Sequence, residues 1–189
     1  MSRVIVVEFM SLDGVTQDPD GNEGTPYGGW AFRYGLGPVT GDPFGLGQVL
    51  DTGALLLGRQ TWQMFARIWP GRDDPFSARM NAMPKLVASR SLGQAAGWQN
   101  SAILPGDLAA AVRERKRAQD IVVMGSASVV RALMAQDLID EYRLKVFPEI
   151  VGDGERLFPA GTAPALLTLA SAEAVGPAVR LVYTRPASQ

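Results

Sequence analysis

The fold is decided by the stretch Ile121-Val122-Val123-Met124-Gly125-Ser126-Ala127-Ser128, where an aliphatic run leads through a small-residue turn into a helix. The aliphatic part does not alternate polar with apolar residues, which is typical of a strand covered on both faces. The segment Ser126–Gln136 that follows has an apolar face at helical spacing, formed by Val129, Val130, Leu133 and Met134. A buried strand followed directly by an amphipathic helix predicts a βαβ unit with a parallel sheet.

Three more aliphatic runs of the same kind precede this one, at Val4–Val7, Ala54–Leu57 and Leu86–Ala88. Helical segments lie between the runs, at Thr61–Ile68 and at Asp107–Arg117, where Asp107 is a suitable N-cap. Strands that alternate with helices predict an α/β protein with a mostly parallel central sheet flanked by helices.

The C-terminal third differs, because its strand-like segments are not separated by helical ones. These segments are Asp140–Phe147, Leu166–Ala174 and Ala178–Thr184. The turn Gly176-Pro177 joins the last two, so we expect them to form an antiparallel hairpin at one edge of the sheet.

Residues 13–49 form a long segment rich in glycine and in aromatic residues. A loop of this length in a compact domain is usually functional or disordered, and its aromatic content argues against disorder. We interpret it as a substrate-side loop with a helix near Phe44–Leu50, the alternative being a surface insert. The length of 189 residues predicts a single domain over residues 1–189.

The composition excludes several kinds of chemistry. The chain has no Cys and no His, which excludes disulfides, thiolate nucleophiles and Ser-His-Asp triads, and we expect no metal site. A net charge of −1 gives no general attraction to nucleic acid or to anionic membranes. Glu8 interrupts the N-terminal apolar stretch, which does not fit a signal peptide, so we expect a cytoplasmic protein.

Groups suited to binding phosphate follow three of the expected strands. They are Gly58, Arg59 and Thr61 after the second strand, Ser89 and Arg90 after the third, and Gly125, Ser126, Ala127 and Ser128 after the fourth. Parallel strands bring their carboxyl ends to one edge, where helix N-termini and guanidinium groups attract anions. The same residues at 125–128 also suit a tight turn in which Ser126 caps the helix, and the sequence leaves both interpretations open.

The ordered set of motifs resembles the RibD C-terminal domain branch of the dihydrofolate reductase-like superfamily. The set comprises Ser11–Gly14, Leu57–Trp62, Ser89–Leu92, Gly125–Ala127, Leu138–Leu144, Pro148–Gly154 and Leu157–Pro159. The resemblance, which covers about residues 3–184, implies a dihydrofolate reductase-like fold and NADPH as cofactor. It further implies that Arg59 and Thr61 hold the 2′-phosphate and pyrophosphate sides of the cofactor, and that Ser89 and Arg90 also face the adenosine phosphate. Residues 125–127 would cradle the pyrophosphate.

The remaining candidates are carboxylates and aromatic rings. Asp13 and Glu8 are the candidate catalytic residues, although Asp13 also suits a turn and Glu8 also suits an edge strand or an ion pair. Planar substrates stack on aromatic rings, and the candidates for this role are Trp30, Tyr34 and Phe65, the last of which also has the spacing of a core residue. The segment 27–36 contains no acidic residue, so the resemblance does not extend to the pterin-binding acid of the dihydrofolate reductases proper.

These observations favour an NADPH-dependent reductase of a small planar heterocycle, either pterin-like or pyrimidine-like. Its fold would be like that of the riboflavin biosynthesis reductases. Two alternatives stay open: a nucleotide-binding protein without catalysis, and an enzyme that binds a phosphosugar or nucleotide at the same strand ends. We expect a small-molecule substrate, no nucleic acid or membrane partner and, by family analogy, a homodimer.

Overall fold

The structure is a computed structural model that describes residues 2–186, so the first residue and the last three of the expected domain lie outside it. The chain divides into two compact units. The first unit comprises Met1–Val6 and Gly45–Ile139, and the second comprises Val7–Phe44 and Asp140–Gln189. The first strand, β1, begins in one unit and ends in the other.

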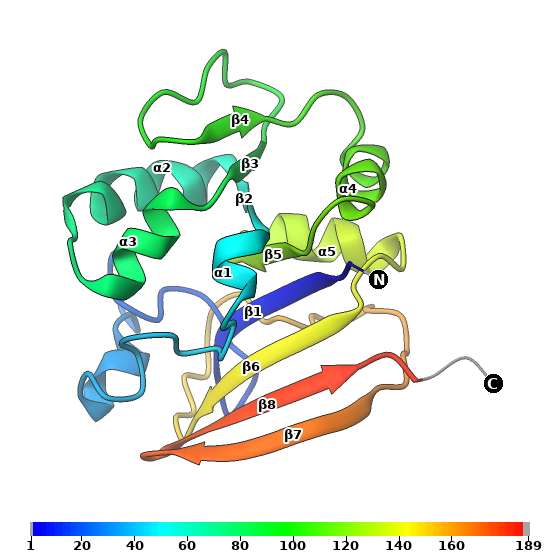
Figure 1. The fold of residues 1–189 in the computed structure, drawn as a ribbon. Helices are drawn as coiled ribbons and strands as arrows, with labels where there is room; N and C mark the ends of the chain where they lie inside the picture. Colours follow the sequence, from blue (N-terminus) through cyan, green and yellow to red (C-terminus); the bar gives the residue numbers. More distant parts are fainter. Residues whose placement is uncertain (1, 187–189) are drawn as a thin grey trace. The chain divides into compact units, whose positions relative to one another are not determined.

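The strands form one mixed eight-stranded sheet in the order β4-β3-β2-β5-β1-β6-β8-β7 (Figure 1). Their bounds are β1 Val4–Ser11, β2 Ala54–Gly58, β3 Lys85–Ala88, β4 Ser101–Ile103, β5 Ile121–Met124, β6 Glu141–Phe147, β7 Thr168–Val175 and β8 Ala178–Thr184. β2 pairs in parallel with β3 and with β5, and β3 pairs in parallel with β4. β8 pairs antiparallel with both β6 and β7. The expected α/β fold, with a mostly parallel sheet and a C-terminal antiparallel hairpin, is therefore confirmed.

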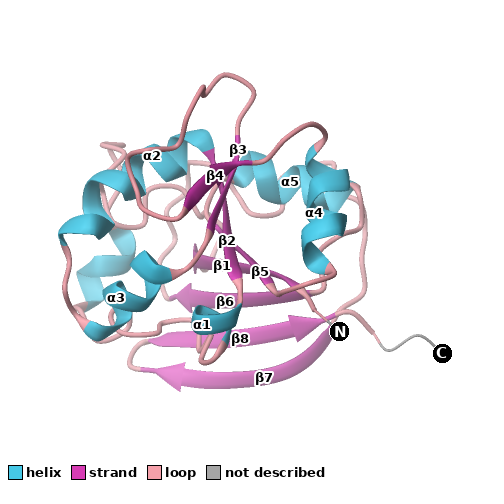
Figure 2. Cartoon of the chain, turned by 45° about the horizontal axis from the view of Figure 1, so that its top comes forward, coloured by secondary structure: helices cyan, strands magenta, loops and turns pink. Residues whose placement is uncertain are grey.

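The α-helices belong to the first unit. They are α1 Val49–Thr52, α2 Arg59–Ile68, α3 Pro75–Ala82, α4 Leu108–Lys116 and α5 Ala127–Ala135, and the 3-10 helix η2 Trp69–Gly71 follows α2. Figure 2 shows α2 and α3 on one side of the parallel strands and α4 and α5 on the other. This cover explains why β2 and β5 are buried along their whole length. None of the helices among the described residues is long and apolar enough to span a membrane.

Two elements of the first unit were not expected from the sequence. α3 begins at Pro75 behind the N-cap Asp74, whose side chain accepts hydrogen bonds from the N–H groups of Phe76 and Ser77. An acid at the N-cap followed by proline is a helix-start signal, but the helix has little amphipathic pattern. β4 has three residues, too few for a periodicity to be visible. The helix expected near 44–50 is the short α1, which lies a few residues later.

The second unit contains β6, β8, β7, the end of β1 and the long loop. Within the loop, the 3-10 helix η1 spans Trp30–Tyr34. Trp30, Phe147 and Ala178 are fully buried in one cluster, against which Phe9 and Tyr34 pack. The loop therefore contributes its own share of the hydrophobic core, which gives the physical reason for its aromatic content.

Asp18 organises the first half of this loop. Its side chain is fully buried and accepts hydrogen bonds from the N–H groups of Glu23 and Thr25 and from the Thr25 hydroxyl, at 2.7 to 2.9 Å. The backbone of Gly28 comes so close that a Cβ there would lie 2.2 Å from Asp18 Oδ2. A buried carboxylate with several donors holds a turn-rich segment in one conformation.

Candidate functional site

Three strand ends that carry the predicted phosphate-binding groups meet at one edge of the first unit. In the parallel ladder Gly58 at the end of β2 is level with Ala88 at the end of β3. On the other side of β2, Leu56 is level with Val123 of β5. Arg59, Arg90 and Ser126 therefore all follow strands that end at the same edge. This is the edge at which open α/β sheets bind their ligands.

A hydrogen-bonded link joins the ends of β2 and β5. Ser126 Oγ accepts a hydrogen bond from the Gly58 N–H at 2.6 Å and donates one to Thr61 Oγ1 at 2.8 Å. Ser126 stands at the N-cap position of α5, but its side chain makes no capping hydrogen bond to that helix. Ser126 is thus the N-cap residue that the tight-turn interpretation expects, but its hydroxyl bonds to the neighbouring strand–helix junction and does not cap α5.

The glycines at this junction leave room for a close approach. A Cβ on Gly58 would lie 2.7 Å from Ser126 Oγ, and one on Gly125 would lie 3.1 Å from Thr61 Cγ2. Gly125 also has a φ of +68°, which disfavours any residue with a side chain. The N–H groups of Ala127 and Ser128 open α5, and no described residue accepts a hydrogen bond from either. Such N–H groups favour an anion.

Two guanidinium groups stand beside this junction without an acidic partner. Arg59 is exposed at the first position of α2, whose first turn contains no acid, and Arg90 is exposed just after β3. Neither arginine forms an ion pair with any residue in the described part of the chain. A cation at a helix N-terminus opposes the helix dipole, so the position of Arg59 favours an anionic ligand.

Ser89 lies between β3 and Arg90 and is half-buried. Its hydroxyl oxygen accepts hydrogen bonds from the N–H groups of Leu92 and Ser91, at 3.0 and 3.3 Å. The hydroxyl proton remains available as a donor. Ser89 thus shapes the turn that carries Arg90 and adds a donor next to it.

Asp13 is held in the second unit by several donors, after the end of β1. Its Oδ1 accepts hydrogen bonds from the Ser11 hydroxyl at 2.7 Å and from the Val151 N–H at 3.1 Å, while Oδ2 accepts one from the Gly152 N–H at 2.9 Å. Arg156 Nη2 lies 3.5 Å from Oδ2. These donors, the Ser11 hydroxyl first among them, lower the pKa of Asp13 from its usual 3.8 to about 2. The geometry favours the turn-forming role, in which Asp13 ties the 148–154 loop to β1.

Glu8 lies in the middle of β1 and is buried, with 8% of its surface exposed. β1 is an inner strand of the sheet, so the exposed-edge interpretation of Glu8 is wrong. Along the strand the side chains alternate between faces, which separates Glu8 from Phe9 and its aromatic cluster. An ion pair and a catalytic role both remain as interpretations of this carboxyl.

The three predicted substrate-stacking residues have different surroundings. Trp30 is fully buried, its ring meets Phe147 edge-on and its Nε1 donates to the Gln17 carbonyl, so it has no exposed ring face. Tyr34 is half-buried, with its hydroxyl 2.9 Å from both the Pro148 carbonyl oxygen and Glu149 Oε2. Phe65 is half-buried on α2. Its ring packs against Trp69 and Trp98, as a core residue would.

Glu149 is a residue of the second unit that sequence reasoning did not select. One of its oxygens lies 2.6 Å from Arg33 Nη1 and the other 2.9 Å from the Tyr34 hydroxyl. The hydrogen bond to Glu149 raises the pKa of Tyr34. Glu149 belongs to the Pro148–Gly154 motif, but only the fold brings it beside residues more than a hundred positions earlier in the chain.

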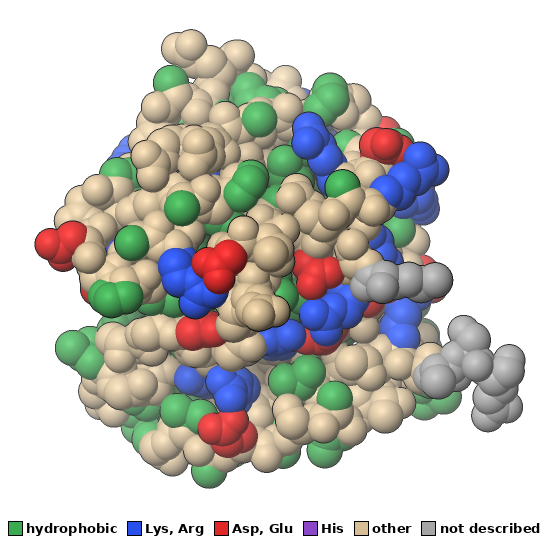
Figure 3. Space-filling view, in the orientation of Figure 1, with side chains coloured by type: hydrophobic (Ala, Val, Ile, Leu, Met, Phe, Trp, Pro, Cys, Tyr) green, Lys and Arg blue, Asp and Glu red, His purple; other side chains and the backbone are tan. Residues whose placement is uncertain are grey.

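Among residues 2–186, no group of three or more Asp, Glu, His or Cys side chains is arranged to hold a metal ion. Basic and acidic side chains are interspersed over the face seen in Figure 3, in keeping with a net charge of −1.

A mixed sheet of this order, with flanking helices and antiparallel C-terminal strands, defines an α/β protein of the dihydrofolate reductase-like fold. The chain belongs to the RibD C-terminal domain family, whose model matches residues 2–181. This confirms the resemblance seen in the motifs.

The relatives and the solved structures agree with this assignment. The chain is 27% identical over 164 residues to the uncharacterized protein YyaP of Bacillus subtilis, which covers 82% of this chain and 80% of YyaP. A putative riboflavin biosynthesis protein from Shewanella sp. PV-4 has a TM-score of 0.76 at 20% identity, over 98% of this chain and 99% of that one. A pyrimidine reductase-like protein from Corynebacterium diphtheriae has a TM-score of 0.66 at 13% identity, over 99% and 93% of the two chains. At such identities the solved structures show the fold alone.

Proposed function

We propose that this protein is an NADPH-dependent reductase of a small planar heterocycle, either pterin-like or pyrimidine-like. The observation that carries the proposal is the pair Arg59 and Arg90, two exposed guanidinium groups without acidic partners among the described residues, at neighbouring strand ends of one parallel sheet. The pair suits the 2′-phosphate that distinguishes NADPH from NADH. Membership of the RibD C-terminal domain family supports the same cofactor.

The residues of the first unit suit each part of such a cofactor. Arg59, Arg90 and the Ser89 hydroxyl would hold the 2′-phosphate by charge and hydrogen bonding. The N–H groups that open α5 and the glycine at 125 would admit a pyrophosphate close to the backbone. The bound cofactor would supply a hydride, and the chain would bind, orient and exclude water.

The choice of substrate class rests on similarity. The pyrimidine reductase-like protein of C. diphtheriae and the putative riboflavin biosynthesis protein of Shewanella share the fold, which supports a pyrimidine-like substrate. In the second unit, Tyr34 and Glu149 offer a phenol and a carboxylate that suit the donor and acceptor edge of a heterocycle. Glu8 is our candidate proton donor, since Asp13 with a pKa of about 2 is ionised at neutral pH.

A second candidate is a nucleotide-binding protein that does not turn over a substrate. It is favoured by the surroundings of Asp13, whose oxygens both accept hydrogen bonds, from the Ser11 hydroxyl and from the N–H groups of Val151 and Gly152. The third candidate, an enzyme of a phosphosugar or another nucleotide, would use the same strand ends without a nicotinamide.

The experiment that tests the proposal is titration of the purified protein with NADPH and NADH, followed by nicotinamide fluorescence and by quenching of the tryptophans. We expect micromolar binding of NADPH and much weaker binding of NADH, followed by oxidation of NADPH in the presence of a pyrimidine or pterin substrate. Tight binding of NADPH without turnover over a broad substrate panel would favour the binding protein. Preference for a sugar phosphate over NADPH would favour the third candidate.

We also propose that the protein forms a homodimer through β7. This strand is the last in the sheet order, and seven of its eight residues are exposed. Leu169 is 53% exposed on β7, and Val179 is 38% exposed on the adjacent β8. A long apolar edge strand invites pairing with another strand, and two copies of β7 could pair antiparallel about a twofold axis.

A further inference from the structure

The turn between β5 and α5 contains two successive residues in the left-handed region. Gly125 has a φ of +68° and Ser126 a φ of +67°. The other described residues with a side chain and a positive φ are Asp18, Asn100 and Asp137, types that adopt this conformation more readily than serine does. The structure thus holds Ser126 in a disfavoured conformation at the strand end where a ligand is expected, which calls for a compensating interaction.

The compensating interaction is the pair of hydrogen bonds made by the Ser126 hydroxyl. Its oxygen accepts from the Gly58 N–H at 2.6 Å, and its proton goes to Thr61 Oγ1 at 2.8 Å. Gly58 ends β2 and Thr61 lies in the first turn of α2, so a single side chain from the β5–α5 turn touches both sides of the β2–α2 junction. This hydroxyl therefore connects the β5–α5 turn to the β2–α2 junction, and both places carry anion-binding groups.

The direction of these hydrogen bonds has a consequence for Thr61. Because Thr61 Oγ1 accepts the proton of Ser126, its own hydroxyl proton is directed away from Ser126. No described residue accepts a hydrogen bond from the Thr61 hydroxyl. The chain of donors runs from the Gly58 N–H through Ser126 to Thr61, two residues beyond Arg59, and each bond polarises the next.

We propose that Ser126 is a positioning residue that aims the Thr61 hydroxyl, as the terminal donor of this chain, at a phosphate oxygen of the ligand held by Arg59. The inference rests on the proposed function in that NADPH is the expected ligand. Beyond the contact of Thr61 with the anion, which the family resemblance already implies, it assigns Ser126 as the group that acts through Thr61.

The test compares four single variants. Thr61→Val removes the hydroxyl at constant shape, and Thr61→Ser restores it. Ser126→Ala removes the positioning hydroxyl and keeps the disfavoured φ, whereas Ser126→Gly removes the hydroxyl and relieves the φ. The measured quantities are the Kd for NADPH from fluorescence, the Kd for inorganic pyrophosphate from calorimetry and the midpoint of urea unfolding.

We expect Thr61→Val and Ser126→Ala each to weaken NADPH binding about 5- to 20-fold, and Thr61→Ser to bind within about twofold of the wild type. The double variant Ser126→Ala/Thr61→Val should lose little more than either single variant, because both remove the same chain of donors. Ser126→Gly should weaken binding although it unfolds at a higher urea concentration than Ser126→Ala, a combination that a purely structural role would not produce.

Unchanged NADPH affinity in Thr61→Val or Ser126→Ala would overturn the positioning role and leave the proposed function standing. If the wild type binds neither NADPH nor NADH, the proposed function fails, and pyrophosphate becomes the deciding probe. The positioning role then stands only if the wild type binds pyrophosphate and Ser126→Ala weakens that binding by a similar factor.

Discussion

Gly58 and Ser126 approach each other so closely that a methyl group on Gly58 would lie 2.7 Å from Ser126 Oγ and 3.0 Å from Ser126 Cβ. Gly58 has a φ of −74°, which any residue adopts, so the requirement for glycine comes from space and not from backbone conformation. The contact is made across 68 positions of sequence, between the ends of two neighbouring parallel strands.

Gly58→Ala is therefore expected to lower the free energy of unfolding by about 1–3 kcal/mol, the usual cost of overpacking a tight site. It should also weaken NADPH binding, because the Ser126 hydroxyl can no longer reach the N–H of residue 58. Urea unfolding and fluorescence titration measure the two effects. Gly93→Ala is the matched control, since a Cβ at Gly93 meets nothing within 4 Å. Equal stability of the two variants would contradict the close packing described for Gly58.

Arg59→Ala should weaken NADPH binding about 10- to 100-fold and leave NADH binding within about threefold, because NADH lacks the 2′-phosphate. Titration of the variant with both nucleotides gives the ratio. Arg67→Ala is the control, an exposed arginine near the other end of the same helix. A similar loss for both nucleotides would show that Arg59 does not contact the 2′-phosphate.

We expect Asp13 to contribute to the loss of folding stability at acid pH. Its pKa in the folded protein, about 2, lies below the usual 3.8, so the stabilisation is present above pH 3.8 and is lost as the pH falls from 3.8 toward 2. At pH 6 we expect Asp13→Asn to be less stable than the wild type by roughly 1–2 kcal/mol, and the difference to shrink through that window. Unfolding curves at several pH values measure it.

The control for Asp13 is Asp153→Asn, a change in the same loop at an exposed residue that accepts one hydrogen bond, from the Gly154 N–H. A carboxyl pKa of 4 or above for Asp13 in an NMR titration would contradict the hydrogen bonding described. It would also return Asp13 to the list of candidate proton donors.

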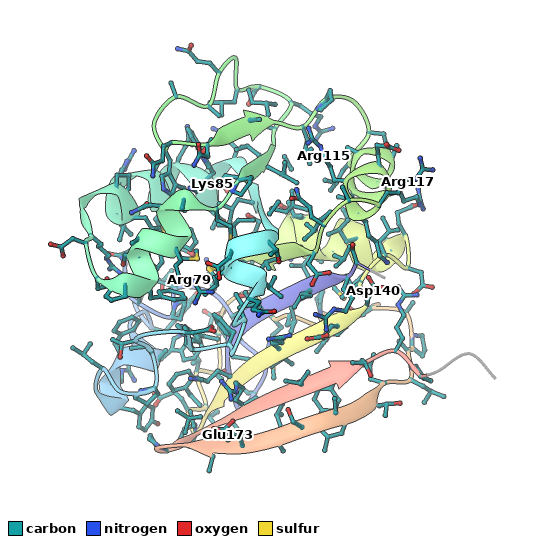
Figure 4. All side chains as sticks on the ribbon, viewed as in Figure 1. Arg79, Lys85, Arg115, Arg117, Asp140 and Glu173 are labelled. Atoms are coloured by element: carbon teal, nitrogen blue, oxygen red, sulfur yellow. The ribbon has the colours of Figure 1, made fainter. Side chains whose placement is uncertain are left out.

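Lys85 makes a second contribution to the pH dependence, in the alkaline range. Its side chain lies at the start of β3 (Figure 4) and is fully buried. Nζ donates to the Asn81 and Gln99 carbonyls and lies 4.3 Å from the centre of a Trp98 ring. Burial lowers the pKa of Lys85 from 10.5 to about 8. Between these values the unfolded chain holds the proton and the folded chain does not, so stability rises as the pH rises from 8 to 10.5.

The wild type should therefore gain about 1–3 kcal/mol relative to Lys85→Met between pH 7 and pH 10. Urea unfolding of the two proteins at a series of pH values gives the difference directly. A difference that stays constant over this range would mean that the folded-state pKa of Lys85 is close to its usual 10.5.

The proposed homodimer predicts that sedimentation velocity gives twice the mass of the chain at micromolar concentration. Leu169→Lys places a charge near the start of the proposed pairing strand β7 and should produce monomers. Leu36→Lys is the control, because Leu36 is exposed to a similar degree, 64% against 53%, but lies in the long loop. A wild-type monomer at all concentrations would contradict the proposal.

The parallel strands were predictable because each of the longer ones is a run of aliphatic residues that is recognisable in the sequence itself. Residues 121–124 are expected as a strand from their aliphatic run, and β5 has the same bounds, as β8 has those of the expected strand Ala178–Thr184. β4 was not predictable, since its three residues form a strand only because β3 offers them a hydrogen-bonded edge. The alignment of Arg59, Arg90 and Ser126 along one edge followed from the rule that parallel strands end together.

The sequence by itself determined the alternation of strand and helix, the antiparallel hairpin and the residue types at each strand end, because these depend on local hydrophobic periodicity and turn chemistry. Only the tertiary structure decided that the Ser126 hydroxyl bonds to the β2–α2 junction instead of its own helix. The same holds for the hydrogen bonds that both oxygens of Asp13 accept and for the burial of Trp30 in the core. A hydroxyl, a carboxylate or an indole can form its hydrogen bonds with neighbours in sequence or with a distant partner. Which of the two it does depends on packing that brings residues from far apart in the chain within hydrogen-bond distance.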